Sequence, residues 1–167
     1  MKKLFEEIRA ALARGENTVL CTVLASSGSA PRGAGARMAV FADGHASGTI
    51  GGGAVERIAA EQALELLRTG ENLLRTFRLS QNQVCDIGMI CGGDVTVYYQ
   101  ILKPEALPFA DALLEMLGSG ENGWLLMRMD ANASVRMGLY DERHGLRFLD
   151  GVSMEALRPM LLARAVY

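Results

Sequence analysis

Residues 47–61 read SGTIGGGAVERIAAE and place three consecutive glycines, Gly51, Gly52 and Gly53, between a short apolar run and a helical pattern. Glycine costs backbone entropy when a chain folds, so a triplet at this junction requires either a tight turn or a ligand near the backbone. A strand that ends in glycines before a helix leaves unpaired N–H groups, and the helix dipole adds positive potential there. The stretch therefore predicts either a phosphate-sized anion site or a helix packed closely on a sheet.

The pattern around this junction predicts an α/β fold, a single domain with a mixed β-sheet flanked by helices. Apolar residues recur at helical spacing before Gly15, and a second amphipathic helix is expected to run to Gly70. An Asp43-Gly44 turn precedes the short strand that enters the glycines. Other strands are predicted at 18–26, 37–42, 73–80 and 94–102. The length of 167 residues suits one well-buried core, so we expect residues 1–167 to form one domain.

Composition excludes several classes of function. The net charge of −2 and the 6% aromatic content offer no basic, aromatic face, so neither nucleic acid nor an acidic membrane is an expected partner. The N-terminus lacks the uninterrupted apolar core of a signal peptide, and no run is long enough to span a bilayer. Cys21, Cys85 and Cys91 have neither disulfide-framework nor zinc-site spacing. We therefore expect a cytoplasmic protein.

Two stretches of the chain resemble each other. ARMAVFADGHASGTIGGGAVE can be laid on SVRMGLYDERHGLRFLDGVSMEA so that His45 falls on His144 and Glu56 falls on Glu155. The match is short, so it is consistent with a degenerate internal duplication and equally with shared amphipathic patterning. The second stretch has no glycine triplet and no counterpart of Arg32, so whatever requires these residues belongs to the first stretch alone.

A second candidate patch is SSGSAPRGAGAR, residues 26–37. Its small residues and proline predict a loop that can fold over a ligand, while Arg32 and Arg37 provide forked donors suited to phosphate oxygens. Either arginine is alternatively solvated or paired with Glu56 or Asp43.

A third candidate patch is CDIGMICGGDV, residues 85–95, in which Cys91 is followed by Gly92 and Gly93. Flanking glycines leave the sulfur accessible, and nearby N–H groups favour the reactive thiolate. The alternative is a small turn residue without chemical consequence. Cys85 is either a second loop thiol or incidental. We interpret His45 and His144 as surface turn residues, because neither has a serine or cysteine partner at a recognisable spacing.

Taken together, these patches resemble the N-terminal domain of the xanthine dehydrogenase accessory proteins, the XdhC/CoxI family. The elements that carry the resemblance are G-S-x-P-R-x-x-G-A-x-M, D-G-x-x-x-G-x-I-G-G-G and G-M-x-C-G-G, all present in order at fitting distances. The resemblance covers residues 5–102, and three linked motifs are far more specific than one.

The resemblance implies an accessory protein or chaperone rather than a catalyst. Family members are regarded as binding the molybdenum cofactor, or molybdopterin, as cargo, and as protecting it during sulfuration and insertion into an apo molybdenum hydroxylase of the xanthine dehydrogenase type. A sulfur-donating cysteine desulfurase is a further implied partner. No catalytic residue is assigned. The implied cofactor-binding residues are Arg32, Arg37, Gly51, Gly52, Gly53, Cys91, Gly92 and Gly93, with Cys91 also near the molybdenum or involved in sulfur handling.

Two features depart from the family pattern. Many members carry a cysteine directly after the glycine triplet, where this chain has Ala54, and this puts the sulfuration step in doubt. Longer members continue into a dinucleotide-binding-like C-terminal domain, which is absent from these residues. The missing domain would remove one wall of an interdomain cleft, and a homodimer could replace it.

Two other functions compete with the chaperone. The first is a small nucleotide-dependent enzyme that uses the glycine loop, with Glu56 as the only good local general base. We favour instead a Glu56 side chain that caps its own helix. The second is a structural adaptor of the same fold that binds no cofactor.

Overall fold

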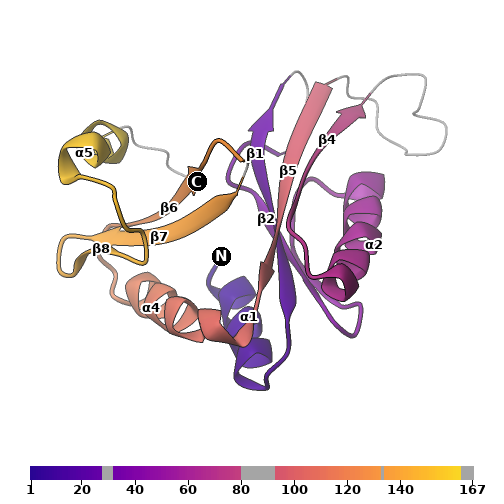
Figure 1. Cartoon of the computed structure of the whole chain (residues 1–167), viewed down its shortest axis with the longest axis horizontal. Coiled ribbons are helices and arrows are strands. Elements are labelled where there is room, and N and C mark those ends of the chain that lie inside the picture. Colours follow the sequence, from indigo (N-terminus) through magenta and orange to yellow (C-terminus); the bar gives the residue numbers. More distant parts are fainter. Residues whose placement is uncertain (28–31, 80–92, 133, 163–167) are drawn as a thin grey trace. The chain divides into compact units, whose positions relative to one another are not determined.

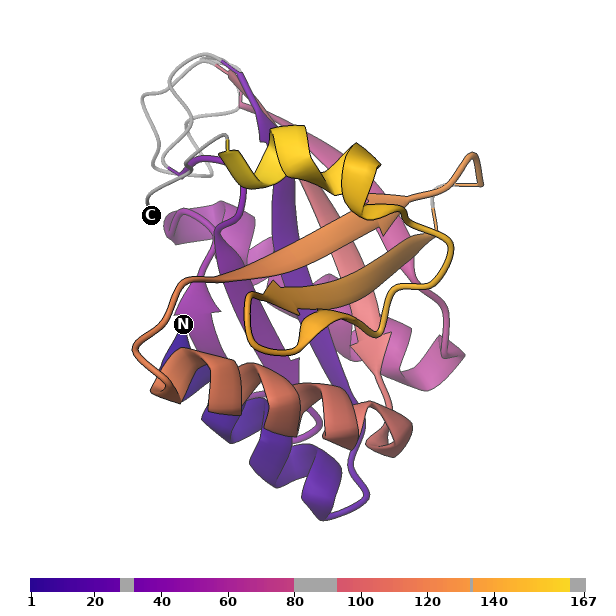
Figure 2. The same cartoon turned by 90° about the vertical axis from the view of Figure 1, so that its left-hand side faces the viewer.

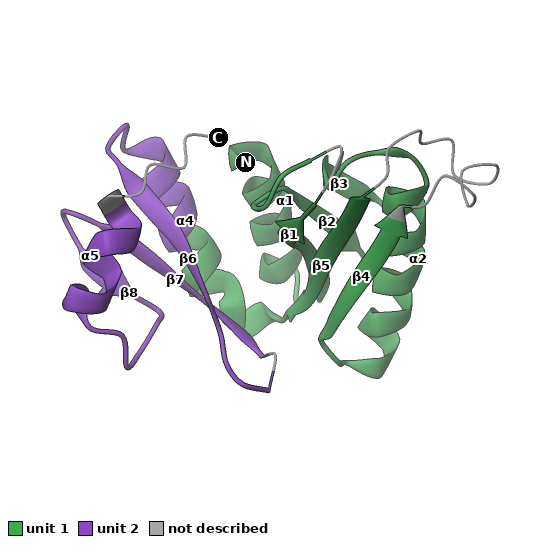
Figure 3. Cartoon of the chain, turned by 90° about the horizontal axis from the view of Figure 1, so that it is seen from above, with its two compact units in different colours: residues 1–111 green, residues 112–167 purple. Residues whose placement is uncertain are grey.

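The computed structural model of the chain describes residues 1–27, 32–79, 93–132 and 134–162. The chain divides into two compact units, Met1–Asp111 and Ala112–Tyr167 (Figure 3). Each unit has its own β-sheet, and each is described below by itself. The expectation that all 167 residues form one domain stays a prediction.

Unit 1 is built around a five-stranded sheet in the order β3-β2-β1-β5-β4. Its elements along the chain are α1 (Lys2–Ala13), β1 (Thr18–Ser26), β2 (Arg37–Phe41), β3 (Ala46–Thr49), α2 (Gly53–Thr69), β4 (Leu73–Leu79), β5 (Gly93–Leu102), the 3₁₀-helix η2 (Pro104–Ala106) and the start of α4 (Leu107–Gly118). These bounds confirm the predicted α/β class and agree with the predicted elements to within one or two residues.

The strand directions differ from the mixed sheet expected from the sequence. Each of the four strand pairs in the five-stranded sheet is antiparallel. Helix α2 does return the chain to its earlier direction, but it connects β3 to β4, which are the two opposite edges of the sheet. The strands that it makes parallel are therefore never neighbours.

The central strand β1 is buried on both faces. Side chains alternate along a strand, so Val19, Cys21 and Val23 share one face, and they join a core cluster with α2 residues including Ala59 and Ala63. Helix α1 packs against the opposite face (Figure 1). Cys21 is fully buried in this cluster, and burial raises the pKa of its thiol to about 12, so it is a packing residue.

Unit 2 repeats the order of elements that opens unit 1. Most of α4 is followed by a three-stranded antiparallel sheet and a final helix, which Figure 2 shows in yellow beside the orange strands. The elements are β6 (Gly123–Met129), β7 (Val135–Asp141), β8 (Gly145–Arg147) and α5 (Met154–Leu162). The shared order of helix, three strands and helix supports the duplication that the sequence alignment suggested.

The turn between β7 and β8 confirms the interpretation of His144 as an exposed turn residue, and its contacts show how the turn is held. The buried carboxylate of Asp141 accepts a hydrogen bond from the His144 backbone N–H at 2.7 Å, and His144 Nδ1 lies 3.0 Å away. Arg147 donates to the other carboxylate oxygen at 2.8 Å. Burial acts to raise the pKa of Asp141, but these partners hold it below its ordinary value. His144 therefore anchors the turn to Asp141.

The β2–β3 hairpin generates a test of its packing. Gly48 has a φ of +83°, and a Cβ there would lie 2.5 Å from the carbonyl oxygen of Arg37 on β2. Gly48→Ala is expected to lower the free energy of unfolding by about 2 to 4 kcal/mol, because a left-handed backbone and an overpacked contact both add cost. Urea denaturation monitored by circular dichroism measures this change.

The matched control is Gly44→Ala in the preceding turn. Gly44 has a similar φ of +85°, but a Cβ added there would have no atom within 4 Å. Its substitution should cost only about 1 kcal/mol, the backbone contribution alone. Equal losses in the two variants would show that the contact with Arg37 does not constrain this hairpin.

Candidate functional site

The end of β1, where the patch at residues 26–37 begins, and the start of β5, where the motif at residues 88–93 ends, lie side by side at one end of the five-stranded sheet. Strand β1 ends at Ser26, beside the start of β5 at Gly93. The next pair is fixed by two hydrogen bonds, from Ser27 N–H to the Asp94 carbonyl at 2.9 Å and from Asp94 N–H to Ser27 Oγ at 3.2 Å. Cys85, Cys91 and Gly92 lie outside the described residues.

The glycine triplet lies at the same end of the sheet. Arg37, the first residue of β2, pairs with Thr22 of β1 on one side and with Thr49 of β3 on the other. Thr49 ends β3, and the chain then passes through Ile50 and the three glycines into α2. Antiparallel pairing thus brings the C-terminal end of β3 to the same end of the sheet at which β1 ends and β5 begins.

The glycines are required by the backbone conformation of this turn. Gly51, Gly52 and Gly53 have φ values of +142°, +82° and +63°. Gly52 also has a ψ of 179°, a combination that is essentially restricted to glycine. A Cβ on Gly52 would meet no atom of the described residues within 4 Å, so among them this glycine makes no close contact between helix and sheet.

Glu56, in the first turn of α2, folds back over the glycine turn. Its Oε1 accepts hydrogen bonds from the N–H groups of Gly52 at 2.7 Å and Ile50 at 3.0 Å. The same oxygen accepts hydrogen bonds from the Gly51 N–H at 3.2 Å and from the Thr49 hydroxyl. These contacts confirm that Glu56 serves the start of its own helix.

The surroundings of Glu56 favour its charged form. Partial burial acts to raise the pKa of Glu56, but the Thr49 hydroxyl and the three backbone N–H groups together hold it below its ordinary value. The contribution of these contacts to stability is therefore fully present above the ordinary pKa of a glutamate and is lost as the pH falls through the lowered one. A carboxylate held in this way is a weak general base.

The two predicted arginines differ in their surroundings. Arg37 is half-buried, and its Nη1 donates a hydrogen bond to the Gly35 carbonyl at 2.9 Å, so it fixes the loop that precedes β2. Arg32 is exposed, and within the described residues it lies in no ion pair. Of the two guanidinium groups, that of Arg32 is open to a ligand.

Ala54 occupies the second position of α2 and is buried, with 8% of its surface exposed. It is therefore a packing residue beside the glycine turn. Across the described residues, no group of three or more histidine, cysteine, aspartate or glutamate side chains is arranged to hold a metal ion. The predicted proximity of Cys91 to molybdenum lies outside those residues and stays a prediction.

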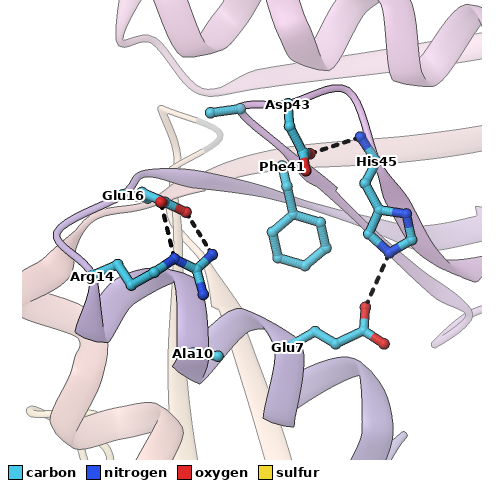
Figure 4. Close-up of a pocket in the computed structure, with 8 residues that line it drawn as sticks. Glu7, Ala10, Arg14, Glu16, Phe41, Asp43 and His45 are labelled. Carbon is cyan, nitrogen blue, oxygen red and sulfur yellow. Dashed lines mark hydrogen bonds and ion pairs between the residues drawn. The ribbon is translucent and has the colours of Figure 1, made fainter.

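A pocket in unit 1 lies at the opposite end of the sheet and contains none of the predicted site residues. Its volume is about 580 Å³, and it lies between α1 and the β2–β3 turn (Figure 4). Two side-chain contacts cross its lining: Arg14 Nη2 lies 2.7 Å from a Glu16 carboxylate oxygen, and His45 Nε2 lies 3.3 Å from one of Glu7. His45, which was predicted only as a turn residue, also stacks its exposed ring on that of Phe41, with the two ring centroids 5.6 Å apart.

Comparison with known proteins supports the resemblance seen in the motifs. Residues 11–78 match the sequence profile of the XdhC and CoxI family. The chain is 39% identical over 94 residues to the molybdenum cofactor insertion chaperone PaoD of Escherichia coli, a match that covers 56% of this chain and 29% of PaoD. It is 38% identical over 82 residues to the uncharacterised E. coli protein YqeB, covering 49% of this chain and 15% of YqeB.

The fold also matches a crystal structure, that of a Bacillus halodurans protein described as a xanthine dehydrogenase. The TM-score is 0.73 at 17% identity, and the match covers 89% of this chain and 46% of the other. The chain thus spans less than half the length of each of these three proteins. No helix in the described part of the chain is long and apolar enough to cross a membrane. The residues that match the XdhC and CoxI family profile, 11–78, contain the first two motifs.

Proposed function

We propose that this chain is an accessory protein that binds the molybdenum cofactor as cargo and assists its insertion into a molybdenum hydroxylase. The observation that carries the proposal is the meeting, at one end of the sheet, of described residues that flank the motifs: Ser27 lies beside Asp94, and Arg37 lies beside Thr49. The match of residues 11–78 to the family profile and the similarity to a cofactor insertion chaperone support the same function.

The described residues at this end of the sheet fit a ligand that carries a phosphate. Arg32 provides an exposed guanidinium, whose fork suits phosphate oxygens, and at Gly52 no described residue blocks the approach of a flat pterin to the backbone. Gly51 and Gly53 maintain the turn. From their position in the third motif, we assign Gly92 and Gly93 to cofactor binding and Cys91 to the vicinity of the molybdenum.

The finer parts of the proposal concern the client and the sulfur. We propose a client of the xanthine dehydrogenase type, a cysteine desulfurase as the sulfur donor, and a homodimer that completes the wall of the site. Because Ala54 replaces the cysteine that often follows the triplet, Cys91 would be the motif thiol that remains for the sulfuration step. The competing nucleotide-dependent enzyme loses its general base, since Glu56 is engaged by four hydrogen bonds.

Cargo binding can be tested directly. The chain purified from cells that make molybdenum cofactor should contain molybdenum and a fluorescent pterin in equal amounts, near one per chain. The same chain purified from cells unable to make the cofactor provides the blank. Absence of both signals from folded protein would refute cargo binding and favour the adaptor.

Arg32 is expected to contribute to affinity and not to stability. Arg32→Ala should weaken cargo binding about tenfold to hundredfold, the effect of losing one hydrogen bond to a charged group. Its free energy of unfolding should stay within about 0.5 kcal/mol of the original value, because the side chain is exposed. Arg68→Ala, which removes an exposed charge at the far end of α2, is the matched control. Equal affinity in both variants would remove Arg32 from the site.

Cys91 is expected to act after cargo binding. Cys91→Ser should retain the pterin and lose most of the activation of an apo-hydroxylase in a reconstitution assay, because an alcohol does not form the reactive thiolate at neutral pH. Cys85→Ser, which alters the other thiol of the segment, is the control and should activate the enzyme normally. Full activation by Cys91→Ser would exclude this thiol from the mechanism.

A further inference from the structure

The turn that resembles an anion site already contains an anion of its own. Three consecutive N–H groups, those of Ile50, Gly51 and Gly52, point at one carboxylate oxygen of Glu56, and the Thr49 hydroxyl points at the same oxygen. Convergent backbone N–H groups before a helix are the usual means of holding a phosphate. Here the four donors are satisfied within the chain.

We infer that Glu56 is a positioning residue, which fixes the glycine turn by occupying its anion position and thereby leaves the phosphate of the cargo to the Arg32 guanidinium. This inference rests on the proposed function for the identity of the cargo. The hydrogen bonds from the N–H groups of the turn to Glu56 do not depend on the identity of the cargo. The glycines then serve the shape of the turn and the approach of the ligand, and they do not bind through their N–H groups.

The chain's second half supports this link between Glu56 and the glycines. Glu155 occupies the corresponding place in the first turn of α5, but it is exposed, and Asp150-Gly151-Val152 replaces the triplet. There the Ser153 Oγ accepts a hydrogen bond from the Ala156 N–H at 3.2 Å and so caps the helix. The folded-back glutamate therefore occurs where the glycines shape the turn and not where they are missing.

Competition favours the internal carboxylate over a free anion. Glu56 is four residues from Gly52 on the same chain, so it binds the turn as an intramolecular ligand and loses no translational freedom. A phosphate that displaced it would have to replace four hydrogen bonds and leave a carboxylate beside its own negative charge. Arg32 is exposed and, in the part of the chain that the structure describes, lies in no ion pair, so it offers the same phosphate a positive charge.

Nuclear magnetic resonance can separate the two modes of anion binding. Inorganic phosphate is titrated into ¹⁵N-labelled protein, and the amide signals of Ile50, Gly51 and Gly52 are followed together with the side-chain Nε–H of Arg32. In the original chain the three amides should stay in place while the Arg32 signal shifts. In Glu56→Ala the same amides should become responsive to phosphate, and phosphate affinity should rise at least fivefold.

Two further variants keep the test decisive. Glu56→Gln retains the size of the side chain and its acceptor oxygen without the charge, so its three amides should respond to phosphate, but less than those of Glu56→Ala. This variant carries the test where Glu56→Ala does not fold. Glu155→Gln is the matched control in the second half and should behave like the original chain. A phosphate response of the three amides in the original chain, or its absence in a folded Glu56→Ala, would overturn the inference.

The outcome is separable from that of the cargo experiment. A chain that purifies without pterin but gives the expected phosphate responses would refute the proposed function and retain the positioning role of Glu56. A chain that purifies with pterin, but whose Ile50, Gly51 and Gly52 amides respond to phosphate, would support the proposed function and refute the positioning role of Glu56. A purely structural role for Glu56 would lower stability in both Glu56 variants without creating any phosphate response.

Discussion

Burial of strand β1 on both faces is the constraint on which the rest of unit 1 depends. The strand is hydrogen-bonded to β2 at one edge and to β5 at the other, so its backbone is satisfied only inside a sheet of at least three strands. Its side chains need a cover on each side, which α1 and α2 provide. Once β1 is fixed in this way, its pairing determines the end of the sheet at which β5 and β2 begin.

Local pattern was sufficient to predict the helices and strands, and it was insufficient for their pairing. The apolar run that begins at Thr18 and the amphipathic helix ending at Gly70 carry their own periodicity, and both appear with nearly the predicted bounds. Whether neighbouring strands are parallel depends on which strands pair. The local sequence around α2 does not show that this helix connects two strands at opposite edges of the sheet. The sequence therefore indicated the α/β class and not the antiparallel sheet.

The candidate site shows the same division. A special backbone at Gly52 could be predicted, because three successive glycines are costly in entropy where an ordinary turn would serve, and the motif resemblance pointed to Arg32. A Glu56 side chain that caps its own helix was predicted, but the N–H groups of Ile50 and Gly51, which precede the helix, were not expected to point at the same carboxylate. A signal existed in the short spacing between Gly52 and an acidic residue in the first helical turn, which is close to that of a capping box. Its meaning depended on the positive φ angles, which only the structure provides.

Glu56 and Ala54 together explain how this chain can keep the shape of its turn while departing from the family motif. The turn is held by a carboxylate that reaches back from the fourth helical residue, and this contact does not involve the second residue, where Ala54 is buried. Exchange of a cysteine for alanine at that position therefore removes a thiol without removing any hydrogen bond of the turn. Shape and sulfur chemistry are thus separable at this junction, and the loss of one does not require the loss of the other.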